Sequence, residues 1–255
     1  MTWLLWLGLV LCVLAVAAAG LSAYGEHRWA GATQALLGKL EASRRDGRQS
    51  GQQNDVTPPT RYHARELEGL PAPVQRYFRA VLKDGQPIIT AVTIDIAGTF
   101  NMAPTGEQWK PFTSRQRVIT RRPGFMWDAR IAMLPGVRAL VVDSYIVGKG
   151  LLHATVQGLF TVADVQGEGE IARGEFMRWF AEVAWYPTAL LPSQGVRWEA
   201  VDDHLANATV VDGPISLTLI FRFNDAGLIG SFRAESRGGM VGDKMVIALA
   251  FEFSP

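Results

Sequence analysis

Three charged side chains occur at helical spacing in a segment that is otherwise rich in aromatic residues. Glu175, Arg178 and Glu182 would share one face of a helix that we predict over residues 174–185. Two neighbouring carboxylates can act as acid and base in catalysis. The same spacing is also typical of a solvated helix face with ion pairs, and the pattern favours that interpretation.

Asp143 lies in the second of two predicted hairpins, whose turn is LPGVR at residues 134–138. Counting outward from this turn pairs Trp127 with Tyr145. The surface of the sheet on this side would carry Trp127, Ile131, Asp143 and Tyr145. It could hold a ligand between an aromatic wall and a carboxylate. The alternative, which is the commoner case for a buried polar group, is an Asp hydrogen-bonded inside the core.

The first predicted hairpin turns at RRPG, residues 121–124. This turn pairs Arg117 with Asp128 and Arg115 with Arg130, all on the opposite surface of the sheet. The residues of this predicted cationic patch are Arg115, Arg117 and Arg130. The favoured interpretation is that they form ordinary Arg–Asp ion pairs on a solvated face. Because side chains alternate along a strand, an error of one residue would exchange the two surfaces.

The run WYPTALLP follows the predicted helix at residues 185–192. Its first two side chains, Trp185 and Tyr186, could form the lip of a ligand cavity. They could also close the end of the sheet, and this interpretation is favoured.

Motifs for covalent, metal or nucleotide chemistry are not found in the sequence. The four histidines match no zinc-site spacing, Cys12 is the only cysteine, and no phosphate-binding loop or nucleophile elbow occurs. The sequence therefore predicts no catalytic residue, no metal ligand and no cofactor. A binding protein is favoured over an enzyme.

The N-terminal segment has no charged side chain from Thr2 to Tyr24. About 20 apolar residues, rising ~1.5 Å each, cross the ~30 Å hydrocarbon core of a bilayer. A transmembrane helix is favoured over a cleaved signal peptide because no basic residue precedes the apolar run. The nearest basic residues all follow it, at Arg28, Lys39, Arg44 and Arg45. This asymmetry predicts a single-pass protein with a cytoplasmic domain.

Residues 26–65 connect this anchor to the rest of the chain. Trp29, Thr33 and Leu40 fall at helical spacing, so the anchor could continue as a helix, either lying on lipid headgroups or as a simple extension. Residues 43–60 are polar and end in two prolines, which is typical of a linker. The expected division is an anchor at 1–25, a juxtamembrane helix and linker at 26–65, and a β-rich domain at 66–255.

The β-rich domain shows two helical patterns among many strand patterns. Helices are predicted from Pro71 and over residues 174–185, whereas alternating apolar residues predict about nine strands. The expected fold class is α+β. The N-terminal transmembrane helix is followed by a curved, mainly antiparallel β-sheet, or half-barrel, with one covering helix.

The composition limits the classes of partner. Lys and Arg total 25 against 24 acidic residues, a net charge of +1, whereas a nucleic-acid-binding protein would carry a basic excess. Eight Trp and twelve Phe indicate a thick aromatic core or a lined cavity. The expected partners are therefore membrane lipid and an apolar small molecule, and not nucleic acid.

A set of longer motifs carries a family resemblance. These are LPAPVQRY (70–77), PGFMWDAR (123–130), WYPTALLP (185–192) and VRWEAVDD (196–203). Together, over residues 66–235, they resemble an uncharacterised bacterial membrane-anchored family, a domain of unknown function with PGF-x-WDAR and W-[YF]-PTALLP motifs. The resemblance implies membrane association and no established activity. Family members continue beyond the final run MVGDKMVIALAFEFSP, so a C-terminally truncated chain is expected.

A weaker, fold-level likeness is to the half-barrel of periplasmic lipoprotein carriers, which hold acyl chains. With the features above, it leads to the prediction of a membrane-anchored binding module for an apolar or acyl-chain ligand. The alternatives are a structural or assembly protein with a filled core, and an enzyme acting on a lipid-like substrate through Asp143 or Glu182. A cavity of several hundred cubic ångströms would favour ligand binding or catalysis, as is usual for ligand sites.

Overall fold

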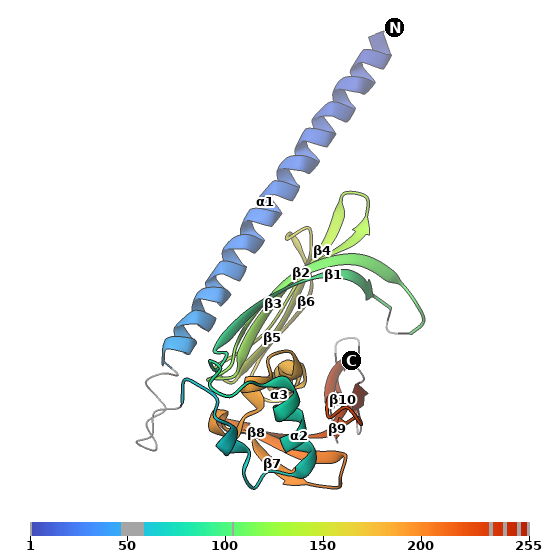
Figure 1. Cartoon of the computed structure of the whole chain (residues 1–255). Helices are drawn as coiled ribbons and strands as arrows, with labels where there is room; N and C mark the ends of the chain where they lie inside the picture. Colours follow the sequence, from blue (N-terminus) through green and yellow to red (C-terminus); the bar gives the residue numbers. More distant parts are fainter. Residues whose placement is uncertain are drawn as a thin grey trace.

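The computed structural model of the chain describes residues 2–46, 59–103 and 105–234, and beyond them three short strands at 237–241, 244–248 and 251–253 (Figure 1). The first element is a single helix, α1 (Thr2–Asp46). Its N-terminal half stands clear of the rest of the protein, with apolar side chains exposed from Trp3 to Leu21. This half is long and apolar enough to cross a membrane.

The C-terminal half of α1 packs on the protein itself. Trp29, Thr33 and Leu40 are buried, as their helical spacing suggested, and the surface they pack on is the outer face of a β-sheet. Trp29 donates a hydrogen bond from its indole nitrogen to Asp128 Oδ1 at 2.8 Å, and its ring stacks on His153. The predicted juxtamembrane helix therefore lies against the domain. The polar linker lies largely outside the described residues, at 47–58.

The sheet under α1 is a six-stranded antiparallel meander in which each strand pairs with the next along the chain. Its strands are β1 (Ala91–Asn101), β2 (Trp109–Ile119), β3 (Gly124–Leu134), β4 (Val137–Ile146), β5 (Lys149–Val156) and β6 (Phe160–Gly167). The sheet curves, with α1 along its convex face and the remaining elements on its concave side (Figure 1).

A second antiparallel sheet lies across the concave side of the first (Figure 1). It has the order β13-β10-β9-β8-β7, and β11 and β12 form a separate hairpin. The bounds are β7 (Arg197–Ala200), β8 (Leu205–Asp212), β9 (Ile215–Phe223), β10 (Ile229–Ala234), β11 (Arg237–Val241), β12 (Lys244–Ala248) and β13 (Phe251–Phe253). Alternate residues of β9 face the core, because Leu217, Leu219, Phe221 and Phe223 are all buried.

Helices and 3-10 turns contribute to the core that joins the two sheets. The two α-helices are α2 (Ala72–Val81) and α3 (Glu170–Ala181). The 3-10 turns are η1 (Ala64–Leu67), η2 (Glu182–Trp185), η3 (Pro187–Leu190) and η4 (Pro192–Gln194). In α2, Val74, Tyr77 and Phe78 face the core at the predicted spacing. The α+β class and the curved antiparallel sheet are confirmed, and the second sheet is an addition to the prediction.

Candidate functional site

Helix α3 is seated close against the concave face of the six-stranded sheet. The approach depends on Gly150 in β5, where a Cβ atom would lie 2.6 Å from the carbonyl oxygen of Ile171. The contact brings Phe176 onto Tyr145, with ring centroids 4.9 Å apart and the rings nearly parallel. Two residues further along α3, Arg178 also contacts the sheet, at Asp143 of β4.

Arg178 is the centre of a largely enclosed polar cluster between α3 and the sheet. Its Nη1 atom donates to Asp143 Oδ2 at 2.7 Å, and its Nε atom donates to Glu182 Oε1 at 3.0 Å. Gln116 Nε2 donates to the other oxygen of Glu182. The guanidinium also lies over the rings of Phe125 and Trp127, 5.0 and 4.9 Å from their centroids. These aromatic contacts favour the cation beyond its two ion pairs.

The charges in this cluster do not balance, because one guanidinium serves two carboxylates. Burial raises the pKa of Asp143, and Glu182 adds to the rise, while Arg178 opposes both. For Arg178, burial alone would lower the pKa, but the carboxylates of Glu182, Asp143 and Glu175 outweigh it and the pKa is raised. The arginine therefore stays charged, and the raised pKa makes Asp143 readier than a free aspartate to accept a proton.

The cluster is nearly closed to solvent. The side chains of Arg178 and Asp143 are only 22% and 15% exposed. Asp143 Oδ1 and Gln116 Oε1 have no hydrogen-bond partner among the described residues. Such an arrangement can hold a proton and fix the position of α3. It resembles a buried structural ion-pair cluster, with two oxygen atoms left unpaired, more than an open catalytic site.

The structure places the predicted ligand-binding residues of the sheet on one face but does not join them into one site. Trp127, Ile131, Asp143 and Tyr145 all point to the concave side. The Tyr145 hydroxyl donates to Asp212 Oδ2 in the second sheet, at 2.7 Å, and not to Asp143. Burial, followed by this hydrogen bond, raises the pKa of Tyr145 well above its usual range.

The predicted strand register was wrong by two residues in both hairpins. Trp127 lies opposite Asp143 and not Tyr145, and Arg115 lies opposite Asp128. The first turn occupies four residues, 120–123. In the second hairpin, the turn has two residues, and β3 has a bulge at Met133 just before it. Because the error is even, each side chain remains on the predicted face.

The three arginines of the predicted cationic patch form ion pairs. Arg115, Arg117 and Arg130 share the convex face as predicted, and each has an acidic partner. Arg115 pairs with Asp95, Arg117 with Glu41 of α1, and Arg130 with Asp128 and more distantly with Glu26 of α1. Arg117 and Arg130 therefore form part of the contact between α1 and the sheet, whereas Arg115 forms an exposed ion pair between β1 and β2.

One prediction needs correction. The face of α3 that carries Arg178 and Glu182 was expected to be solvated, but it lies against the sheet. Trp185 is exposed and Tyr186 is buried. Nothing in the structure tests ligand binding by these residues, so that remains a prediction.

An aromatic group on the concave face was not recognised as such from the sequence. Phe100, Phe112 and Trp127 have ring centroids 5.9 to 6.4 Å apart, and Phe100 is 39% exposed. The three lie on β1, β2 and β3, and alternation alone would have placed them on one face once the first two strands were paired.

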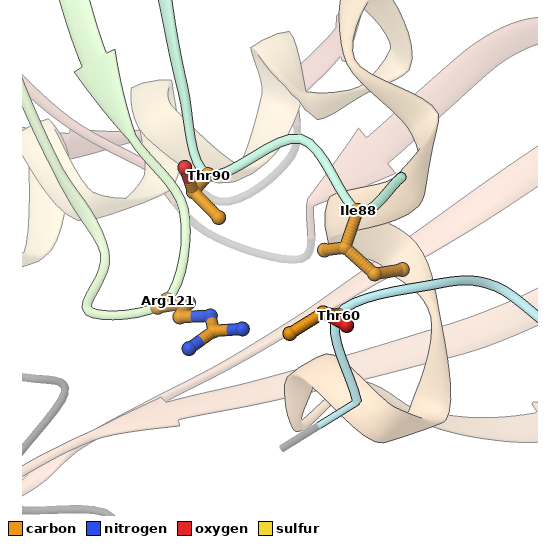
Figure 2. Close-up of a pocket in the computed structure, with 4 residues that line it drawn as sticks. All are labelled: Thr60, Ile88, Thr90 and Arg121. Carbon is orange, nitrogen blue, oxygen red and sulfur yellow. The ribbon is translucent and has the colours of Figure 1, made fainter. Parts of the chain in front are cut away.

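A cavity of about 410 Å³ lies elsewhere, where the chain enters the domain. Its lining is Thr60, Ile88, Thr90 and Arg121 (Figure 2). None of the predicted ligand-binding residues lines it. The guanidinium of Arg121 also contacts the carbonyl oxygen of Pro59 at 3.5 Å.

Comparison with known protein families gives a match over most of the chain. A family of unknown function (DUF6920) matches residues 68–252. The chain belongs to this family. No curated protein and no solved structure matches significantly. The predicted membership of a family of unknown function is therefore confirmed, and DUF6920 membership carries no activity with it.

Proposed function

We propose that the chain is a single-pass membrane protein whose domain binds an apolar ligand, such as an acyl chain, along part of its concave sheet. The membrane anchor would be the N-terminal half of α1, whose apolar side chains have no protein to pack on. In water this exposed surface would be costly, at roughly 25 cal/mol per Å². A bilayer removes that cost.

The observation that carries the ligand proposal is the lining of the sheet beyond Arg178. Two rows of side chains, called here the distal rows, cross the concave face there. The first contains Ile96, Ser114, Ala129, Val141, Ala154 and Ala163, and the second Gly98, Phe112, Ile131, Ala139 and Val156. The middle of the first row has small side chains. Phe112 of the second row and Phe100, which contacts it, lie at the β1–β2 side of the sheet.

The distal rows retain accessible apolar surface. Ile96, Phe112, Val141, Ala154 and Ala163 are all partly exposed, whereas Ala129, Ile131 and Ala139 between them are buried. An acyl chain lying there would bury methylenes at about 0.8 kcal/mol each, before the ordering costs of binding. The aromatic group would form one wall and Arg178 with Asp143 the inner end.

A structural or assembly protein is the second candidate, and one observation favours it. Trp127 and Tyr145, the predicted aromatic wall, are buried in contacts with the protein's own side chains. Catalysis by Asp143 or Glu182 has weaker support, since both carboxylates are engaged by Arg178 beneath α3.

The test is lipid retention by the full chain, purified in detergent and analysed by native mass spectrometry. Ala163→Phe fills the first distal row, and Ala97→Phe is its matched control, because Ala97 is exposed and points to the other face of β1. If Ala163→Phe excludes two methylenes, bound lipid should fall roughly tenfold. Ala97→Phe should retain wild-type occupancy.

Two results would contradict the proposal. One is a wild-type protein that releases no lipid or other apolar molecule on denaturation. The other is equal occupancy in both variants at equal melting temperature. Either result would leave the structural role as the better account. Carbonate extraction tests the anchor separately, because only a membrane-spanning chain stays in the pellet.

The proposed side of the membrane is the cytoplasm, from the basic residues that follow the apolar run. Glu68 is exposed and lies in the domain. With Cys12 replaced by serine, Glu68→Cys should resist an impermeant maleimide in intact cells and react after lysis. Reaction in intact cells would place the domain outside.

A further inference from the structure

One side chain, Gln157, ties the membrane-proximal part of α1 to the tips of two hairpins. Its Nε2 atom donates to Ser22 Oγ at 3.2 Å and to the carbonyl oxygen of Gly136 at 2.8 Å. Its Oε1 atom accepts from the backbone amide of Arg138 at 3.1 Å. Gln157 is itself in the β5–β6 turn, and Gly136 is in the β3–β4 turn. The two tips and α1 are therefore held at one level.

The helix and the β5–β6 turn also meet without any side chain between them. A Cβ atom at Gly25 would overlap the carbonyl oxygen of Gln157, and one at Gly158 would overlap the backbone of Gly25. Below this contact, Glu26 reaches Arg138 at 3.6 Å and Arg130 at 3.8 Å. The position of the tips along α1 is thus set by backbone contact and ion pairs.

The position of this contact along α1 corresponds to the edge of a bilayer. The first charged residue of the chain is Glu26. About 20 residues of helix, at ~1.5 Å each, span the ~30 Å hydrocarbon core. A core that begins near Trp3 would therefore end near Ser22, the residue that Gln157 contacts. Tyr24 would lie in the interface, where tyrosine is enriched.

The hairpin tips carry large apolar side chains with nothing from the described protein over them. Leu134, at the end of β3, is 66% exposed, and Phe160, at the start of β6, is 69% exposed. Val162 on the same edge strand is also exposed. The β3–β4 hairpin points along α1 toward its N-terminal half (Figure 1).

We infer that the tips of the β3–β4 and β5–β6 hairpins dock on the surface of the bilayer that α1 crosses, with Leu134 and Phe160 inserted among the lipids. Phe160 pairs with Val156, and Val156 with Ala139, so the tips are continuous with the second distal row. The distal rows then open at the membrane surface. The inference rests on the proposed anchoring of α1, and it names the bilayer as the source of the apolar ligand.

The experiment uses the full chain in phosphatidylcholine vesicles, with an environment-sensitive fluorophore on a single cysteine and brominated lipids as quenchers. In a Cys12→Ser background, the label is placed at Leu134→Cys or Phe160→Cys. The matched control is Val147→Cys, an exposed position in the β4–β5 turn at the opposite end of the sheet. The native Cys12, labelled in the unmodified chain, reports on the anchor itself.

We expect the brominated lipids to quench the label at positions 134 and 160, and its emission there to shift to shorter wavelength. The label at position 147 should show neither effect. Equal quenching and equal emission wavelength at all three positions would overturn the inference. If Cys12 is quenched in that case, the anchor stands and only the docking fails. If Cys12 is not quenched either, the proposed anchoring fails as well.

Discussion

The two faces of the six-stranded sheet are each covered by a helix, and the two contacts are built differently. On the convex face, α1 packs through a glycine, a tryptophan and a leucine, and its ion pairs stay partly exposed. The Arg117–Glu41 side chains are 24% and 27% exposed. On the concave face, α3 places an arginine between two carboxylates that are only 15% and 16% exposed, and its guanidinium lies over two aromatic rings.

This difference bears on what holds each helix in place. A partly exposed ion pair contributes about 0–1 kcal/mol, because water screens it and solvates both ions well when they separate. A buried pair contributes little net stability when intact, yet the loss of one partner is costly because the other charge stays buried. The contact of α1 with the sheet therefore depends on shape complementarity. The contact of α3 depends on the presence of both the arginine and its carboxylate partners.

The largest effect is expected when the concave cluster loses its cation. Arg178→Met leaves Asp143 and Glu182 without their common partner and should lower the free energy of unfolding by about 3–5 kcal/mol. Chemical denaturation of the full chain in detergent, followed by tryptophan fluorescence, measures it. Arg173→Met is the matched control, because Arg173 lies on the same helix and its guanidinium donates to the carbonyl oxygen of Ser216, a neutral acceptor.

The same cluster offers a rescue. If charge imbalance causes the loss, replacing both carboxylates by leucine in the Arg178→Met background should recover most of the stability. Equal costs for Arg178→Met and Arg173→Met would show that α3 is held by its aromatic contacts, and the contrast between the two faces would disappear.

On the convex face, the largest effect should come from shape. Gly25→Val forces the helix away from Gln157 and should weaken the α1 contact by about 1–3 kcal/mol, as overpacking does. Cross-linking by a short bis-maleimide between cysteines at Ser22 and Gln157 measures the contact, with Cys12 replaced by serine. Gly31→Val on the same helix is the control, because a Cβ atom there meets nothing within 4 Å. Equal cross-linking in both variants would rule out a shape-dependent contact.

The elements of this fold could be predicted more fully than their contacts. The periodicity of Val74, Tyr77 and Phe78 located α2, and alternation kept Trp127 and Asp143 on one face although the register was wrong by two. Register depends on turn length and on the bulge at Met133, and neither can be derived from apolar alternation.

The polar cluster could not be predicted, for a reason specific to α3. A helix with one apolar and one charged face normally turns its charges to water. Here α3 contacts both sheets, with Phe176 on Tyr145 and Phe180 on Phe221, so its charged face is also covered. Glu182 and Asp143 each stand out in the sequence as carboxylates. Their meeting at Arg178 depends on the close approach at Gly150.

A similar ambiguity applies to α1. The apolar spacing of Trp29 and Leu40 identifies a buried face but does not say whether lipid or protein buries it, since both are apolar surroundings. Asp128, which accepts the hydrogen bond from Trp29, is distant in sequence. Only the pairing of the strands brings it under the helix.

The pH dependence of stability should distinguish the concave cluster further. The folded-state pKa of Asp143 is raised above its ordinary 3.8. As the pH rises above 3.8, the unfolded chain loses this proton while the folded chain keeps it, so stability falls until the folded-state pKa is passed. The fall has a slope of up to ~1.4 kcal/mol per pH unit between the two pKa values, and Asp143→Asn should remove it. Parallel pH profiles for the two proteins would mean that burial leaves the pKa of Asp143 unchanged.

The smallest effect should come from the ion pair between α1 and the sheet. Arg117 Nε and Glu41 Oε1 are 2.7 Å apart, and Arg117 also donates to Thr93, so the geometry is good. Water still reaches both side chains, and a double-mutant cycle with Arg117→Ala and Glu41→Ala should give a coupling of about 0.2–1 kcal/mol, decreasing with added salt. The cycle is measured as unfolding free energies in the same detergent. A coupling as large as the Arg178 effect would mean that charge holds α1 as firmly as it holds α3. The overlap at Gly25 would then be a consequence of the docking and not its cause.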